Sequence, residues 1–237
     1  MKIKNLILYF SLTEKLLWSF SVTAIITSFL ILDKENYLTL VASIIGVTSL
    51  IFCARGNPIG QVLMVFFSII YSIISFSFQY YGEMITYLGM TLPMAVFSLI
   101  TWLKNPFGNQ KSEVAVNRIT VKEVYFMLFL SAIVTLVLHF ILVYFNTSNI
   151  GVSTISITTS FIAAYLAFRR NPFFALAYAL NDTILIILWL LASLKDISYI
   201  PVVICFIVFL VNDLYGFISW LKMMKRQEEA SKNPLQY

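Results

Sequence analysis

Two Asn-Asp pairs and the aromatic residues that follow them are the side chains of this sequence best suited to binding a polar molecule. The set comprises Asn181, Asp182, Trp189, Asn212, Asp213 and Tyr215. Trp189 follows the first pair at seven and eight residues, so these three side chains share one face of a helix. Amides and carboxylates bind hydroxyl and amide groups, and a cation over an indole gains about 0.5–2 kcal/mol. We predict a polar pocket with an aromatic wall; the alternative is that these residues hold helices together or cap a helix end.

A further polar stripe lies between residues 61 and 79. It consists of Gln61, Ser68, Tyr71, Ser72, Ser75 and Gln79. Gln61, Ser68 and Ser75 recur every seven residues, which stacks them on one helix face. Such a face lines a water-filled path or, in the case of the serines, allows helices to pack closely. We therefore add Gln61, Ser68, Tyr71 and Gln79 to the candidate binding residues.

No residue pattern typical of an enzyme is found. His139 is the only histidine, and we interpret it as a packing residue because no Cys or carboxylate is near it in the sequence. Cys53 and Cys205 are isolated from each other and are interpreted in the same way. The sequence has no Ser-His-Asp arrangement, no P-loop and no GxGxxG motif. We predict no catalytic residue, no metal site and no cofactor.

The segments that carry the candidate residues are long and apolar. Hydrophobic residues make up 60% of the 237 residues, charged residues 11%, and the mean hydropathy is +0.88. A bilayer core about 30 Å thick is crossed by roughly 20 helical residues. Because the runs do not alternate with polar residues, we predict an all-α polytopic protein embedded in the lipid bilayer. The eight predicted spans are 16–32, 37–53, 60–80, 84–103, 123–145, 150–168, 172–194 and 199–221.

The basic residues orient these spans. With the N-terminus inside, fourteen of the sixteen Lys and Arg residues fall on the cytoplasmic side, and only Lys34 and Lys195 fall outside. This asymmetry predicts two cytoplasmic termini and explains the net charge of +5 without nucleic acid as a partner. A carboxylate at the bilayer centre costs at least about 2.5–3.5 kcal/mol, so Asp182 is expected to face the interior of the bundle.

Two short motifs occur twice and indicate an internal repeat. Asn57-Pro58 and Asn171-Pro172 are 114 residues apart, and Trp102-Leu103-Lys104 and Trp220-Leu221-Lys222 are 118 residues apart. Each pair lies on the cytoplasmic side, so the repeats are parallel and need one linking helix between them. Parallel repeats are a device of transporters, whose substrate lies between the two units near the bilayer midplane.

We therefore expect one extra helix followed by a 3+1+3 arrangement. The predicted divisions are an N-terminal segment with the extra helix (1–36), a first three-helix unit (37–104), a loop and linking helix (105–149), a second three-helix unit (150–222) and a cytoplasmic tail (223–237). Pro93 lies inside the fourth span, where we expect it to kink the helix.

The chain resembles the PnuC family of bacterial nicotinamide riboside transporters, which are related to the SWEET sugar carriers. The residues that carry the resemblance are Tyr80-Tyr81-Gly82-Glu83-Met84-Ile85-Thr86-Tyr87, Pro93, Trp102 to Pro106, Asn181-Asp182, Trp189, Asn212 to Phe217 and Trp220. The resemblance implies a homotrimer in the bacterial inner membrane that takes up nicotinamide riboside by facilitated diffusion and feeds NAD synthesis. Carriers of another vitamin or nucleoside, such as thiamine, and a non-transporting receptor subunit are the alternatives. An alternative mechanism is ion-coupled transport, with Asp182 and Asp213 carrying protons.

Nicotinamide riboside has a cationic ring, an amide and a ribose, which suit the candidate residues. Trp189 is expected to stack on the ring, and Asn181 and Asn212 to bind the amide or the ribose hydroxyls. Asp182 or Asp213 would balance the charge. Because no cluster of Lys or Arg lies inside the spans, we predict that the riboside binds and that the phosphorylated mononucleotide is rejected.

Overall fold

The structure, a computed structural model, describes residues 9–32, 34, 36–77, 81–108, 110–147 and 149–232. Within this part of the chain, eight helical segments are long and apolar enough to cross a membrane, which confirms the predicted number of spans. Gln79, one of the candidate binding residues, lies outside the described residues.

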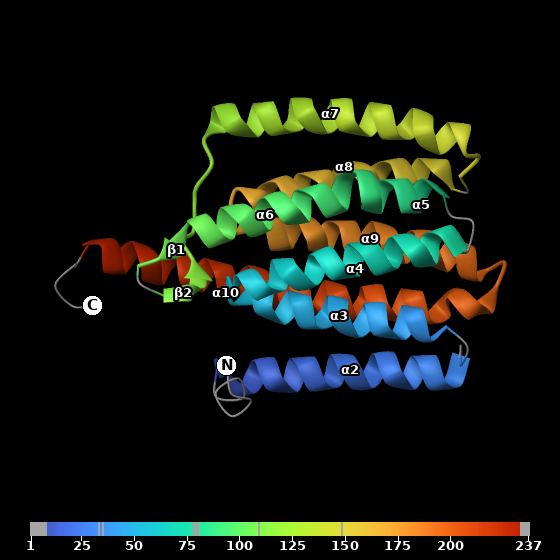
Figure 1. Ribbon diagram of the computed structural model, residues 1–237, viewed down its shortest axis with the longest axis horizontal. Coiled ribbons are helices and arrows are strands. Elements are labelled where there is room, and N and C mark those ends of the chain that lie inside the picture. Colours follow the sequence, from blue (N-terminus) through green and yellow to red (C-terminus); the bar gives the residue numbers. More distant parts are fainter. Residues whose placement is uncertain are drawn as a thin grey trace.

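The eight spans run roughly side by side along the long axis of the molecule (Figure 1). Seven are formed by α2 (Leu12–Leu32), α3 (Tyr37–Ala54), α4 (Pro58–Ser77), α7 (Val121–Tyr144), α8 (Ile150–Phe168), α9 (Phe173–Ser193) and α10 (Ile200–Lys232), the last preceded by η2 (Ile197–Tyr199). The remaining span, the fourth along the chain, consists of α5 (Tyr81–Thr86), the π-helical segment η1 (Tyr87–Thr91) and α6 (Leu92–Lys104). A two-stranded antiparallel hairpin, β1 (Pro106–Phe107) and β2 (Gln110–Val114), follows α6.

The π-helical segment explains how the fourth span accommodates Pro93. Proline has no backbone N–H, and its ring clashes with the carbonyl of the residue four positions earlier, here Gly89. The wider turn over Tyr87–Thr91 contains Gly89 and ends just before Pro93, so the clash is relieved without breaking the helix. The structure thus shows a π turn before Pro93, and the kink stays a prediction.

The helices form a central group with one peripheral helix on each side. In Figure 1, α2 lies at the bottom and α7 at the top, and the other spans lie between them. Helix α4 packs on α3 and α6, while α9 packs on α8 and α10. The two groups meet where α10 contacts α3 and α6 contacts α8. This packing agrees with two three-helix groups joined by α7.

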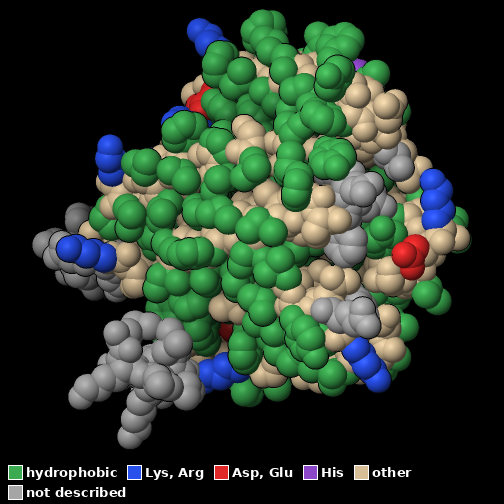
Figure 2. Space-filling view, turned by 45° about the vertical axis from the view of Figure 1, so that its right-hand side comes forward, with side chains coloured by type: hydrophobic (Ala, Val, Ile, Leu, Met, Phe, Trp, Pro, Cys, Tyr) green, Lys and Arg blue, Asp and Glu red, His purple; other side chains and the backbone are tan. Residues whose placement is uncertain are grey.

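Apolar side chains cover much of the outer surface. They are exposed along α2 and α7, for example Phe20, Ile31, Phe129 and Phe140. Figure 2 shows hydrophobic side chains over most of one face, with Lys and Arg at its margins. Exposed apolar side chains of this extent fit contact with lipid tails rather than with water.

Leu12 and Lys232 lie at the same end of the bundle, which we call the terminal end (Figure 1). This end also holds both Asn-Pro turns and the hairpin. The two turns have the same local structure: the Asn57 side chain accepts the N–H of Ile59, and the Asn171 side chain accepts that of Phe173. The loops that contain Lys34 and Lys195 lie at the other end, which we call the opposite end.

Helix α10 is longer than predicted. It continues to Lys232, beyond the expected end of the span at 221, because residues 222–232 contain good helix formers and neither Gly nor Pro. Its extension passes beside the hairpin, where Gln227 accepts the N–H of Val116 and donates to the carbonyl of Val114. Residues 223–232 are therefore an ordered helix that holds the loop after α6.

Candidate functional site

Trp189 lies in a buried aromatic cluster toward the opposite end. Its side chain lies next to Tyr71 of α4, and the ring of Tyr71 lies 4.4 Å from that of Tyr87 in η1. On its other side, the Trp189 ring lies 5.5 Å from that of Tyr199. The sequence assigned Trp189 and Tyr71 to two separate polar groups, and the structure brings them together across the two three-helix groups.

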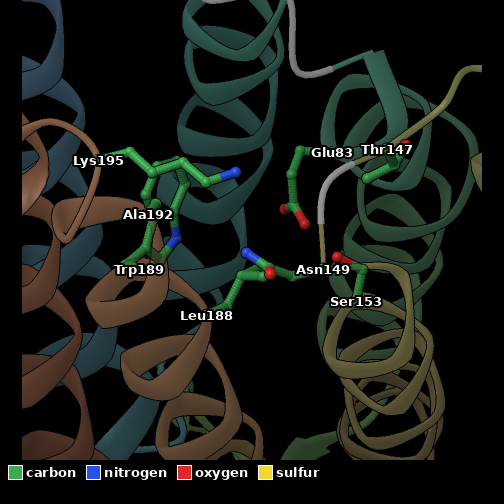
Figure 3. A pocket seen from close by; sticks show the side chains of 8 residues that line it. All are labelled: Glu83, Thr147, Asn149, Ser153, Leu188, Trp189, Ala192 and Lys195. Carbon is green, nitrogen blue, oxygen red and sulfur yellow. The ribbon is translucent and has the colours of Figure 1, made fainter.

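A cavity of about 30 Å³ lies next to Trp189 at the opposite end (Figure 3). Its walls are formed by Glu83, Thr147, Asn149, Ser153, Leu188, Trp189, Ala192 and Lys195. In Figure 3 the Glu83 carboxylate and the Lys195 ammonium point toward each other across this space. A water molecule needs about 10–15 Å³ of such space, whereas ligand pockets usually measure about 300–1,000 Å³. A ligand the size of a nucleoside therefore requires the walls to move apart.

Asp182 of α9 and Asp213 of α10 form a carboxyl pair inside the bundle. Both are buried, with 4% and 5% of their surface exposed. The two side chains lie close enough to interact directly with each other. Asp182 faces the bundle interior, as predicted, and the pair joins the second and third helices of the same group.

Asn181 has different neighbours from Asp182, although the two are adjacent in the sequence. Its side-chain carbonyl accepts hydrogen bonds from Ser156 at 3.2 Å and from Thr159 at 2.8 Å, both on α8. Trp189, Asp182 and Asn181 thus point to α4, α10 and α8 respectively. The shared helix face expected from their spacing is broad enough to contact three different helices.

Asn212 and Tyr215 are directed to α2 instead of the bundle centre. The Asn212 amide donates to Ser21 of α2 at 3.0 Å and to the carbonyl of Val208 at 2.8 Å. The Tyr215 side chain lies beside Ser11 and Glu14. Both residues therefore hold the extra N-terminal helix, which agrees with the alternative reading of polar residues as contacts between helices.

The polar stripe of α4 faces the interior of the bundle. Gln61, Ser68, Tyr71, Ser72 and Ser75 are all buried. Gln61 contacts the sulfur of Cys53 at 3.5 Å, near the terminal end. Ser68 and Ser72 donate to carbonyls one turn earlier in their own helix, so their hydroxyl protons are already used and small size is their main contribution to packing.

Residues 36–222 match the family described as nicotinamide mononucleotide transporter. The chain belongs to this family. A curated relative, the nicotinamide riboside transporter PnuC of Neisseria mucosa, is 23% identical over 200 residues, which cover 83% of this chain and 76% of the relative. A solved structure described as the vitamin B3 transporter PnuC superposes with a TM-score of 0.80 at 21% identity, covering 92% of this chain and 94% of that one.

Membership of this transporter family confirms the resemblance and the general function predicted from the sequence. The fold of eight apolar helices is shared with the PnuC structure. The interpretation of both cysteines and of His139 as packing residues also agrees with the described part of the chain. Cys53 and Cys205 are free and buried there, and His139 contacts Thr154 at 2.8 Å between α7 and α8.

The sequence missed several residues of the cavity in this family member. Glu83 was cited only as part of a motif, and Asn149 and Lys195 lie outside the predicted spans. Tyr87 was cited only as part of a motif. One available signal was Glu83 itself, an acidic residue one position before the predicted start of a span, where the ends of neighbouring helices converge.

Proposed function

We propose that this protein transports nicotinamide riboside across the bacterial inner membrane by facilitated diffusion, without enzymatic activity. Three observations support the proposal: the family membership, the Neisseria relative that is named for this substrate, and a buried tryptophan beside a cavity. The observation that carries most weight is the position of Trp189, which lies both in the aromatic cluster and in the cavity wall. A cationic pyridinium ring stacked there would gain about 0.5–2 kcal/mol.

The proposed binding residues lie between the two three-helix groups. Trp189 and Tyr71 would hold the ring, and Asn181 would bind the amide or a ribose hydroxyl. Asp182 and Asp213 would form the polar floor, since their carboxyl pair lies deeper in the bundle. Asn212 and Tyr215 are better assigned to holding α2.

Transport would proceed by movement of one three-helix group against the other. The packing of α10 on α3 and of α6 on α8 supports a 3+1+3 pair of parallel repeats, an arrangement in which rocking exposes the site to each side in turn. The small size of the cavity supports a closed conformation that opens for substrate. Facilitated diffusion predicts a riboside flux that follows the riboside gradient and ignores proton and sodium gradients.

The terminal end is proposed to be cytoplasmic. Most Lys and Arg residues lie there, whereas Lys34 and Lys195 lie at the opposite end. On this assignment the cavity beside Trp189 is the outer entrance. We further propose a homotrimer, in line with the family resemblance, with the exposed apolar side chains of the peripheral helices facing lipid or neighbouring subunits.

The experiment that tests the function is binding of nicotinamide riboside to the purified protein, followed by uptake into proteoliposomes. Wild-type protein should bind the riboside saturably, and Trp189→Ala should weaken binding at least about tenfold. Trp18→Ala is the matched control, because Trp18 lies on α2 and its indole donates to Thr48, outside the cavity. Absence of saturable binding by the wild-type protein would reject the proposed substrate, while equal losses in the two variants would reject the proposed site.

A further inference from the structure

Glu83 is a buried carboxylate that faces the cavity without a partner. Only 7% of its surface is exposed. Among the described residues, none forms a hydrogen bond or an ion pair with its side chain, and the side chain lines the cavity beside Trp189 (Figure 3). Buried carboxylates normally have partners, because taking a charge out of water is costly. An arrangement of this kind leaves a place for a positively charged ligand.

The backbone around Glu83 is fixed by close packing. Its neighbour Gly82 lies against Leu142 and Thr147 so tightly that a β-carbon built on Gly82 would be 2.3 Å and 2.4 Å from their side chains. Glu83 follows Gly82 directly in α5, so this contact also fixes the position of its backbone. The carboxylate is thus held in position at the entrance by its own helix.

Lys195 is the positive counterpart on the other wall of the cavity. Its side chain is exposed, and its ammonium group points toward Glu83 without forming an ion pair with it (Figure 3). The aromatic cluster of Trp189, Tyr71 and Tyr87 lies next to both groups. A cation entering the cavity would therefore meet one attractive charge, one repulsive charge and a set of aromatic faces.

We infer that Glu83 is the charge-selecting residue of the outer entrance: it favours cationic substrates over neutral ones, and Lys195 moderates this preference. The inference rests on the proposed function and adds to it the residue that distinguishes the pyridinium form of the riboside. The contribution of Glu83 is electrostatic and acts over several ångströms, so it does not require direct contact with the ring.

Two ligands of nearly equal shape separate charge from size. Oxidised nicotinamide riboside is a cation, and its reduced dihydro form is neutral. We expect the wild-type protein to bind the cation at least about tenfold more tightly than the neutral form. Glu83→Gln should bring this ratio below about threefold by weakening binding of the cation alone, while Glu83→Asp, which keeps the charge, should preserve most of the preference.

Lys195→Gln is a second variant, for which the expected change in affinity has the opposite sign. Lys195 is exposed, so its substitution does not disturb the packing of the core. It should raise the affinity for the cation by about two- to fivefold and leave the neutral form unchanged. Lys34→Gln, which removes the same charge from the same end but outside the cavity, is its control and should change neither affinity. Together the variants test both charges.

The outcomes are distinct. An unchanged cation preference in Glu83→Gln, in protein that still elutes as wild type and binds the riboside, overturns the inference and leaves the proposed function standing. If Glu83→Gln does not fold, equal affinities of Lys195→Gln and Lys34→Gln for the cation overturn it instead. Wild-type protein that binds neither form rejects the proposed function, and the inference about Glu83 with it.

Discussion

Trp102 and Trp220 lie against each other with ring centroids 5.4 Å apart, and each donates its indole N–H to the other three-helix group. Trp102 of α6 donates to the carbonyl of Ala167 near the end of α8 at 2.8 Å. Trp220 of α10 donates to the carbonyl of Cys53 near the end of α3 at 2.7 Å. Both side chains are fully buried. The third helix of each group is thus tied to the first helix of the other, in a reciprocal arrangement.

Replacing either tryptophan of this pair by phenylalanine should destabilise the protein. Trp102→Phe and Trp220→Phe each remove the indole donor from a buried carbonyl, which keeps a backbone N–H as its other donor, and each removes part of a packed ring. We expect each variant to lose about 1–3 kcal/mol of unfolding free energy. The quantity to measure is the unfolding free energy of the detergent-solubilised protein in denaturant.

Trp18→Phe is the control for this pair, because Trp18 is partly exposed on α2 and donates to the side chain of Thr48. It should cost less than about 1 kcal/mol. Since the two buried rings touch, the double variant should differ from the sum of the single ones by about 0.5 kcal/mol or more. Strict additivity would show that the two sides of the arrangement act independently.

The reciprocal arrangement was partly accessible from the sequence. The nearly equal repeat offsets of the Asn-Pro and Trp-Leu-Lys motifs predicted which helices correspond, and the distribution of Lys and Arg predicted that all four motifs lie at one end. Apolar length and charge are properties of single segments, so they can be read along the chain. The partner of each indole could not be predicted, because Cys53 and Ala167 offer only backbone carbonyls, which every residue has.

Polar residues inside the spans illustrate a second limit of the sequence. Their burial could be predicted from the cost of placing them in lipid, but the helix that each would contact could not. Asn212 binds Ser21, which is 191 positions away on a helix outside the repeat. Asn181 contacts α8 and Asp182 lies against Asp213 of α10, although they are adjacent, because successive residues of a helix point about 100° apart.

Asn212→Ala should loosen helix α2 and leave riboside binding nearly unchanged. The variant removes the donor to Ser21 and to the carbonyl of Val208, so we expect a loss of about 1–2 kcal/mol in unfolding free energy. Hydrogen exchange of the amides of α2 should become faster. The dissociation constant for the riboside should change less than about threefold, in contrast to that of Trp189→Ala. A loss of binding as large as that of Trp189→Ala would show that Asn212 belongs to the binding site.

Gln227→Ala should weaken the attachment of the loop after α6 to the extension of α10. The side chain of Gln227 is buried and bonds Val116, Val114 and Glu113, so its removal leaves backbone groups of the loop unpaired. We expect a loss of about 1–3 kcal/mol and faster proteolysis between residues 105 and 120. Glu229→Ala, an exposed change two residues later on the same helix, should alter neither quantity. Equal proteolysis of both variants would mean that the loop is held by its other contacts.

Nicotinamide mononucleotide should bind at least about tenfold more weakly than the riboside, although the family description names the mononucleotide. A phosphate needs cationic or N–H donors, whereas the buried polar side chains near the proposed site include the acidic residues Glu83, Asp182 and Asp213. Among the described residues that line the cavity, Lys195 is the single cation, and it lies at the rim. Calorimetric titration of both ligands into the same protein preparation measures the difference. Equal affinities would show that Lys195 is sufficient to hold the phosphate, and Lys195→Gln should then weaken the mononucleotide alone.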